Sequence, residues 1–481
     1  MRTHLSHPTI ADRAEATEER GARTGRGALA GLSLAVLLAS LGTSIANVAL
    51  PTLTQAFGAS FQGAQWVVLA YLLASTTVIV SVGRLGDITG RRRLLVVGIA
   101  VFTVASALCA AAPTLPALIA ARAAQGLGAA IMLALAMALV SEAVPKARTG
   151  SAMGLLGTMS AIGTALGPSL GGLLIGALGW RSIFLVMVPA SAVAGLLAHR
   201  HVPADRRVPK RARAAFDNRG TVLLALTLAS YTLAMTVGRG RFGALNAALL
   251  TAAAVGVALF ALAQARTRSP LIRPALLRST RLSAGLATSA LVSTVMMTTL
   301  VVGPFYLTGA LGLGAAAVGL VMTIGPVVAA LTGVPGGRIA DRFGARRTTV
   351  AGLTGIAAGS LALAAIPTTL DVAGYIAPIV VITASYAIFQ TANNTSVMTG
   401  AGSDQRGVTS GMLNLSRNLG LITGASVMGA VFSLAAGTSA IETAAAGAVA
   451  TAMRVTFLVA AALILAALAI ATAQRTRVAR A

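Results

Sequence analysis

The sequence predicts an all-α membrane protein that crosses the bilayer about fourteen times, and three observations support this fold class. Hydrophobic residues make up 56% of the 481 positions and charged residues only 10%, which is more apolar surface than a water-soluble protein can bury. Apolar stretches of about 20 residues, the length that crosses the hydrocarbon core, recur along nearly the whole chain. Basic residues lie in the short gaps between these stretches, as is typical of cytoplasmic loops.

The individual spans follow from hydropathy, with breaks at charged or Pro/Gly clusters. With a cytoplasmic N-terminus, 31 of the 37 Lys and Arg residues lie on the cytoplasmic side, 4 lie outside and 2 lie within spans. Miscounting by one span would scramble this asymmetry, so we expect both termini to be cytoplasmic. The fourteen predicted spans are 28–50, 64–83, 94–112, 117–140, 151–177, 182–199, 219–237, 244–264, 283–308, 315–335, 348–367, 374–399, 407–435 and 452–473.

Composition argues against several other classes of protein. The net charge of +25 is not gathered in a soluble domain with aromatic platforms, so we expect no nucleic-acid partner. The single cysteine, Cys109, lies in an apolar stretch and supports neither a disulfide framework nor a metal site. No nucleotide-binding G-x-x-x-x-G-K-[ST] motif is present, so no cofactor is expected.

An internal repeat divides the chain. Residues 83–93 (GRLGDITGRRR) are echoed 254 residues later by residues 337–347 (GRIADRFGARR), in each case in a short loop after an even-numbered span. Two homologous six-span halves with two extra spans between them produce this arrangement. The predicted organisation is a disordered cytoplasmic tail at 1–27, a six-helix bundle at 28–199, linkers with two extra helices at 200–281, a second six-helix bundle at 282–473 and a basic tail at 474–481.

Four motifs in order, each on the expected span, resemble the major facilitator superfamily, and within it the fourteen-helix drug:proton antiporters of multidrug and antibiotic efflux. They are the loop at 83–93, LIAARAAQGLG at 118–128 with its arginine inside the fourth span, GTALGPSLGG at 163–172 and LGTSIANVALP at 41–51. The resemblance implies a major facilitator fold, secondary transport in the direction of export, a bacterial cytoplasmic membrane and a role in proton exchange for the fourth-span arginine.

The repeated loops suggest a conformational latch on the cytoplasmic side. Their glycines allow tight turns, and Asp87 and Asp341 lie near a helix start, where an anion is favoured and neighbouring arginines can pair with it. Contacts of this kind form in one state and break in another. The residues assigned to the latch are Gly83, Asp87, Gly90, Arg91, Gly337, Asp341 and Gly344.

Arg122 is the most informative single residue, because a guanidinium inside a span is costly unless it faces a cavity or finds acceptors. Gln125 follows one turn later and shares its face. In the fifth span, Pro168 removes a backbone donor and kinks the helix, while small residues allow close packing and rocking. The residues of this packing motif are Gly163, Gly167, Pro168, Gly171 and Gly172.

Polar and aromatic residues on other spans are candidates for lining a solute site, because amides and rings suit bulky, partly apolar molecules. For each of them alone, helix-to-helix packing is an equally good interpretation. The candidate substrate-binding residues are Asn47, Trp66, Tyr71, Arg122, Gln125, Phe305, Tyr306, Gln390, Asn393 and Asn394.

None of the 12 acidic residues falls in the middle of a predicted span, and Gly42 stands where the fourteen-helix relatives usually carry Asp. A lipophilic cation in a low dielectric needs a carboxylate. We therefore expect a neutral, zwitterionic or anionic solute, with Arg122 facing either the solute or the cavity. For proton coupling, the candidate residues are Arg122 and two groups that could titrate, Asp87 and Glu142.

The predicted partners are a small-molecule substrate, the lipid bilayer and protons, with the protein acting as a monomer. Uniport, protons carried by the substrate and metabolite uptake remain alternatives, and a solute-sensing receptor without flux is a further one. An enzyme is not expected, since the spans hold no paired acids, histidine cluster or nucleophile with its base.

Overall fold

The computed structural model describes residues 10–143, 149–203, 218–237, 243–267, 279–366, 370–399, 406–437, 441 and 444–478, and within these ranges the chain is helical without strands. Thirteen helices in the described ranges are long and apolar enough to cross a membrane. The seventh predicted span is also a helix, but its Arg219, Tyr231 and several threonines make it less apolar than the other thirteen.

The first group of helices contains the first six predicted spans. The helix α1 packs on α6, α8 and α5, while α5 also packs on α3 and α4. The group consists of α1 (Ile10–Val48), α2 (Leu50–Phe57), α3 (Phe61–Thr89), α4 (Arg91–Ala111), α5 (Leu115–Ala143), α6 (Thr149–Leu178), α7 (Ser182–Leu185) and α8 (Met187–His201).

The second group repeats this arrangement. Its first helix, α11, packs on α15 and α17, and α14 packs on α12 and α13. The group consists of α11 (Thr280–Gly309), α12 (Ala315–Phe343), α13 (Ala345–Ala365), α14 (Asp371–Thr399), α15 (Arg406–Thr423), the π-helix η6 (Gly424–Met428), α16 (Gly429–Ala435) and α17 (Ala446–Val478).

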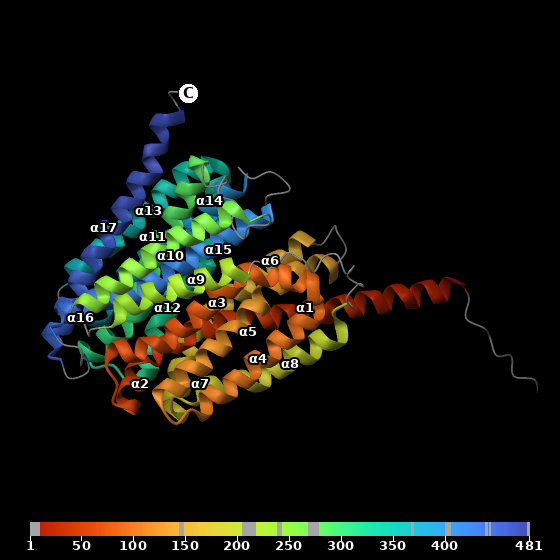
Figure 1. The fold of residues 1–481 in the computed structure, drawn as a ribbon, viewed down its shortest axis with the longest axis horizontal. Coiled ribbons are helices and arrows are strands. Elements are labelled where there is room, and N and C mark those ends of the chain that lie inside the picture. Colours follow the sequence, from red (N-terminus) through yellow and green to blue (C-terminus); the bar gives the residue numbers. More distant parts are fainter. Residues whose placement is uncertain are drawn as a thin grey trace, which may run out of the picture.

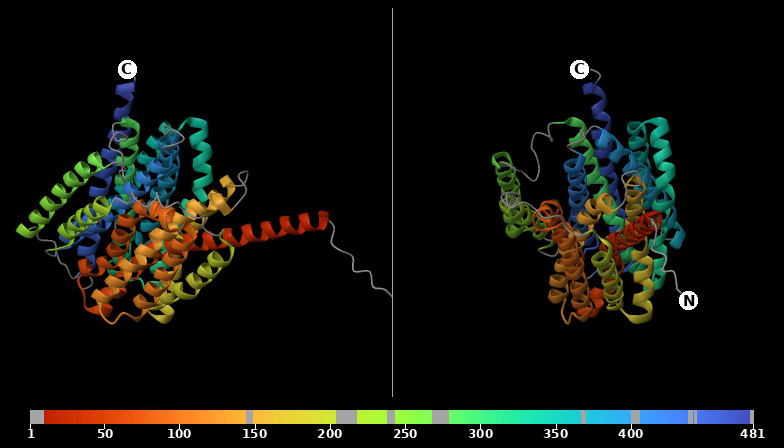
Figure 2. Two further views of the ribbon diagram at one scale, coloured as in Figure 1. Left: turned by 45° about the vertical axis from the view of Figure 1, so that its right-hand side comes forward. Right: turned by 90° about the vertical axis from the view of Figure 1, so that its right-hand side faces the viewer.

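A hairpin of α9 (Asn218–Thr236) and α10 (Ala244–Arg266) connects the two groups. The helix α9 contacts both α3 and η6, so it lies across the boundary between the groups. The hairpin is the green pair on one flank of the molecule in Figure 2. Most of α10 is exposed, as a helix facing lipid would be.

Three segments differ from the sequence prediction. The tail expected to be disordered is helical from Ile10 onward, because its Ala, Glu and Arg residues are strong helix formers that extend α1. The loops expected at 83–93 and 337–347 are shorter than predicted, since α3 continues to Thr89 and α12 to Phe343. Each loop is reduced to one glycine between two helices.

The helices α2, α7 and α16 lie along one edge of the molecule, at the left and bottom of Figure 1. This edge is called the α2 end below. Here α3 contacts η6 and α16, and α2 contacts α11. The two groups are therefore joined at the α2 end.

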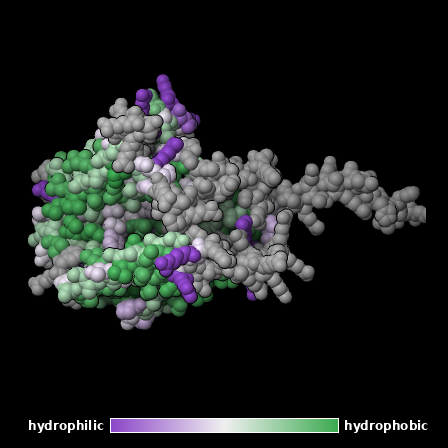
Figure 3. All heavy atoms as spheres, turned by 45° about the horizontal axis from the view of Figure 1, so that its top comes forward, coloured by the Kyte–Doolittle hydropathy of each residue, from purple (hydrophilic) through white to green (hydrophobic). Residues whose placement is uncertain are grey.

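Hydrophobic side chains dominate the described surface in Figure 3. Large examples on different helices are Leu108, Leu262 and Leu458, each more than half exposed. Single exposed leucines are ordinary in a soluble protein, but a surface covered with them matches the hydrocarbon of a bilayer. The surface therefore agrees with the multi-pass membrane fold.

Candidate functional site

Arg122 lies completely buried inside the first group, where its guanidinium joins three helices. Its Nε donates to the carbonyl oxygen of Val67 on α3 at 2.9 Å, and one terminal nitrogen donates to the carbonyl oxygen of Gly42 on α1 at 3.0 Å. The other terminal nitrogen donates to Oε1 of Gln125 at 2.6 Å. No carboxylate is among the acceptors that the described residues supply to this guanidinium. The positive charge is therefore solvated by dipoles and is not neutralised by an ion pair.

Tyr71 covers the face of this guanidinium. The Arg122 Cζ lies 4.3 Å from the centre of the Tyr71 ring, a cation–π geometry, and the Tyr71 hydroxyl donates to the carbonyl oxygen of Ala39 at 2.6 Å. A side chain added at Gly42 would meet the Tyr71 hydroxyl oxygen at 3.0 Å. Tyr71 thus occupies the space into which a longer residue at position 42 would project.

Gln125 extends the cluster to two further helices. Its Nε2 donates to the hydroxyl oxygen of Ser106 on α4 at 2.7 Å and lies 3.4 Å from the sulfur of Met187 on α8. Gln125 is fully buried, like Arg122. The arginine and glutamine together connect five helices of the first group, which is why both polar side chains are tolerated deep in a bundle.

The remaining candidate substrate-binding residues do not gather around Arg122. Asn47 is buried, and its Nδ2 donates to the carbonyl oxygens of Thr43 and Ser44 on its own helix. Trp66 is half-buried against the hydrophobic core. The structure thus separates these two residues from the arginine's hydrogen-bond network.

The candidates in the second group are divided between its two ends. Phe305 packs edge-on against Phe61 with ring centres 4.6 Å apart, and this contact lies between the groups at the α2 end. Asn393 is buried and donates to the carbonyl oxygen of Gly285, whereas Gln390 is half-buried and Asn394 exposed. These residues belong to different contacts in this conformation.

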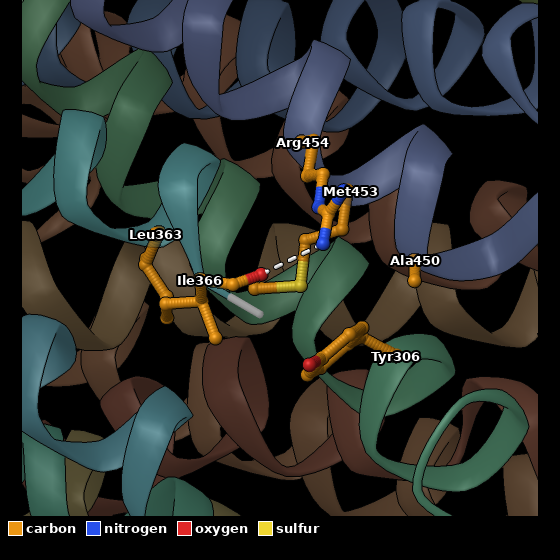
Figure 4. Close-up of a pocket in the computed structure, with 6 residues that line it drawn as sticks. All are labelled: Tyr306, Leu363, Ile366, Ala450, Met453 and Arg454. Carbon is orange, nitrogen blue, oxygen red and sulfur yellow. Dashed lines mark hydrogen bonds between the residues drawn. The ribbon is translucent and has the colours of Figure 1, made fainter. Parts of the chain in front are cut away.

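Tyr306 lines a small pocket with Arg454, Leu363, Ile366, Ala450 and Met453, drawn in Figure 4. Arg454 donates to the carbonyl oxygen of Ile366 at 3.0 Å, at the residue that ends α13. A cation is favoured at a helix C-terminus, so this bond accounts for the arginine. Tyr306 also stacks on Tyr375 with ring centres 5.9 Å apart. Packing at the α2 end explains this pocket without a solute.

The small residues of α6 lie at its contacts with α1 and α12. A side chain at Gly163 would overlap the carbonyl oxygen of Leu37, and one at Gly167 would overlap the Ser44 hydroxyl. Gly171 faces Ile45 and Val48 of α1 in the same way. Pro168 lies inside α6 on the same stretch.

The contact with α12 involves Gly172 and joins the two groups. A side chain at Gly172 would lie 2.7 Å from both the Ala315 carbonyl oxygen and the Gly319 Cα. The backbones of α6 and α12 therefore approach closely at this point, which only small residues permit.

The second group carries a counterpart of the α6 glycines that the sequence reasoning missed. Gly420 and Gly424 lie 257 residues after Gly163 and Gly167. A side chain at Gly420 would overlap the carbonyl oxygen of Ala290 on α11, as Gly163 does with α1. The two loops repeat at an offset of 254 residues, which predicts the position of this pair only to within one helical turn.

At the end opposite α2, the repeated loops share one backbone geometry. Gly90 joins α3 to α4 with φ 100°, and Gly344 joins α12 to α13 with φ 83°. Side chains are rarely tolerated at such φ values, which explains the glycine at both positions. Asp341 is exposed on the last turn of α12, Gly337 is half-buried and Arg91 begins α4. The surroundings of Gly83, Asp87 and Glu142 lie outside the described residues, although all three are within helices.

The contact between the groups at the α2 end involves Phe305 and further residues that were not predicted to join the two groups. Gln62 and Gln65 on α3 both donate across it, to the hydroxyl oxygen of Ser433 at 2.7 Å and to the carbonyl oxygen of Ala425 at 2.8 Å. Phe61 packs between Phe305 and Phe432, with ring centres 4.6 and 5.8 Å away. Two amides and an aromatic cluster close this end.

Comparisons with known proteins identify the family. The family model for the Major Facilitator Superfamily matches residues 32–425. The chain belongs to the major facilitator superfamily. It is 32% identical to the multidrug resistance protein Stp of Mycobacterium tuberculosis over 409 residues, which cover 83% of this chain and 74% of that protein.

One further relative is also a transporter, and one solved structure shares the fold. The riboflavin transporter RibZ of Clostridioides difficile is 27% identical over 401 residues, 83% of this chain and 87% of that protein. Among solved structures, a bacterial homologue of the human lysosomal transporter Spinster, in an inward-facing and occupied conformation, superposes with a TM-score of 0.65 at 16% identity, covering 94% of this chain and 97% of that one. The chain is therefore a multi-pass membrane transporter, as its four motifs predicted.

Proposed function

We propose that this transporter exports a small, partly hydrophobic solute, such as a drug, antibiotic or metabolite, by alternating access between its two helix groups. The observation that carries the proposal is the pair of hydrogen-bonded amides that joins the groups at the α2 end. The groups also meet at the small-residue approach of α6 to α12, which permits rocking, so the hydrogen-bonded contact at the α2 end can open without disrupting either bundle. The similarity to the multidrug resistance protein Stp supports export as the direction.

The proposed orientation places both termini in the cytoplasm of a bacterial cell and the α2 end outside. The distribution of Lys and Arg between the loops supports this orientation. In it, the conformation described here is closed to the outside. The rocking units we propose are residues 28–199 and 282–473, with Asp87 and Asp341 acting as latches at the opposite end.

The proposed substrate class is neutral, zwitterionic or anionic. The support is the buried charge of Arg122, whose acceptors in the described chain are carbonyl and amide oxygens only. Without a neighbouring carboxylate this charge produces a positive potential in the first group, which repels a permanent cation in a low dielectric. The Tyr71 ring beside it is 2% exposed in this conformation, so a flat, apolar solute would reach the ring only after the surrounding helices move apart.

We further propose that export is coupled to protons and that the monomer is the working unit. Asp87 and Glu142 are the proposed proton-carrying groups, with Arg122 modulating the exchange. A cycle of this kind requires a group that binds a proton in one state and releases it in the other.

A transport screen in a bacterial strain lacking its own pumps tests the proposed function. The strain expresses the wild type, Arg122→Ala or Asp87→Asn and is exposed to solutes of each charge class. Expected are lower accumulation of a neutral or anionic solute with the wild type, and loss of this effect in both variants at equal protein levels. Gly447→Ala is the matched control, because nothing in the described residues lies within 4 Å of its added methyl group. Efflux of a permanent cation that is unaffected by Arg122→Ala would count against the proposed substrate class.

A further inference from the structure

The side chain of Gln65 reaches from the first group into a helix of the second. It is 1% exposed, and its Nε2 donates to the carbonyl oxygen of Ala425. This carbonyl belongs to η6, the one-turn π-helix at Gly424–Met428 between α15 and α16. A side chain at Gly429 would overlap the Gln65 amide nitrogen. The glycine at position 429 therefore creates the space in which the glutamine lies.

A π-turn in an α-helix requires a local cause, because its i→i+5 hydrogen bonds are rarely favoured. In an α-helix the Ala425 carbonyl would accept from the amide of Gly429, whereas here it accepts from Gln65. The inserted side chain thus supplies a hydrogen bond that the regular helix would supply itself. The π-turn and the closed α2 end depend on the same contact.

The neighbouring residues make the closed state reversible. Gln62 donates to Ser433 four residues after Gly429. The Oε1 atoms of both Gln62 and Gln65 are buried without a hydrogen-bond partner in the described structure. Such oxygens cost free energy when the contact is closed and regain hydration when it opens. Each glutamine therefore stabilises the closed state with its nitrogen and opposes it with its oxygen.

We propose that Gln65 and η6 form a clasp that couples the opening of the α2 end to rewinding of the helix. When Gln65 withdraws, residues 424–428 return to α-helical bonding. A π-turn holds one more residue than an α-helical turn. Its return to α-helical bonding therefore rotates the helix after residue 428 by about 100° relative to the helix before it, which is one residue's share of a 3.6-residue turn. Phe432 and Ser433 then leave the face that contacts Phe61 and Gln62, so opening becomes cooperative. This inference rests on the proposed alternating access.

Two variants should break the same contact from its two sides and shift the equilibrium in the same direction. Gly429→Ala excludes the Gln65 side chain and favours the open α2 end. Gln65→Leu removes the amide that donates to the Ala425 carbonyl, so the helix must supply that hydrogen bond itself, and the open end is again favoured. A purely structural role would instead lower the stability of both variants without moving the equilibrium between the open and closed ends.

Electron–electron distance measurements on protein in lipid nanodiscs test the clasp. Spin labels on Gln55→Cys in α2 and Ala446→Cys in α17, both exposed positions, report the width of the α2 end, in a Cys109→Ala background that removes the single native cysteine. The ratio of long to short distances should rise about tenfold in both Gly429→Ala and Gln65→Leu, the change expected for the loss of about one net hydrogen bond. Gly447→Ala should leave the ratio at the wild-type value.

A cryo-electron microscopy map of Gly429→Ala should show an unbroken α-helix through residues 424–428. Solute transport by each variant in proteoliposomes separates the possible failures. Unchanged distances or a persistent π-turn in a protein that transports its solute would overturn the clasp and leave the proposed function standing. A wild type that moves no solute and shows one fixed distance would overturn both.

Discussion

The substitution Gly163→Ala tests the close approach of α1 and α6. Its methyl group would overlap the carbonyl oxygen of Leu37 and lie 3.1 Å from the backbone nitrogen of Leu41, so the two helices must separate. Overpacking of this kind costs about 1–3 kcal/mol. Separation also weakens the 2.7 Å hydrogen bond between Ser40 and Ser160, worth about 0.5–1.5 kcal/mol. The better helix propensity of alanine offsets about 1 kcal/mol of this destabilisation.

The expected net result is a loss of about 0.5–3.5 kcal/mol in the free energy of unfolding. The matched control is Gly157→Ala on the same helix, where the described residues leave the methyl group open space and helix propensity alone should add about 1 kcal/mol. Equilibrium unfolding by SDS, followed by circular dichroism in mixed micelles, measures both. If the two variants were equally stable, the proposed packing role of the α6 glycines would be refuted.

Three further variants probe other parts of the site. Gly420→Ala should lower the free energy of unfolding as Gly163→Ala does, measured in the same SDS titration, and wild-type stability would contradict the repeat of the packing contact. Arg122→Lys should reduce the rate of solute transport at least about tenfold, because an ammonium cannot reach three acceptors as the guanidinium fork does. Solute transport by the variant in proteoliposomes at the wild-type rate would contradict this role of the guanidinium. Gly42→Asp places a carboxylate against Tyr71 and beside Arg122, so ethidium efflux should appear in cells, and its continued absence in a folded variant would contradict the charge argument.

Hydropathy and the charge pattern were sufficient to locate thirteen of the fourteen predicted spans, because each requires about 20 apolar residues and leaves its basic residues in the loops, whereas the seventh, at 219–237, is a helix that is less apolar. The glycines at 90 and 344 were equally predictable, since a one-residue connection between helices at positive φ needs glycine. The helical tail from Ile10 was missed because its polar composition resembles that of a disordered segment as well as that of an exposed helix.

The interactions of the candidate site were harder to predict. The importance of Arg122 was visible from its position in a span, but two of its acceptors are backbone carbonyls, which every residue possesses and no motif can identify. The π-turn at 424–428 was invisible for a similar reason. Its hydrogen bond comes from Gln65, which is 360 residues away in the sequence. Contacts of this separation depend on how the two groups pack.

The most direct test of the central claim is solute and proton movement by purified protein in proteoliposomes loaded with a pH-sensitive dye. We predict that a neutral, zwitterionic or anionic solute accumulates when a proton gradient is imposed, that adding this solute changes the internal pH, and that Arg122→Ala abolishes both effects. Absence of flux for every class of solute, or flux of a permanent cation that is indifferent to Arg122→Ala, would contradict it.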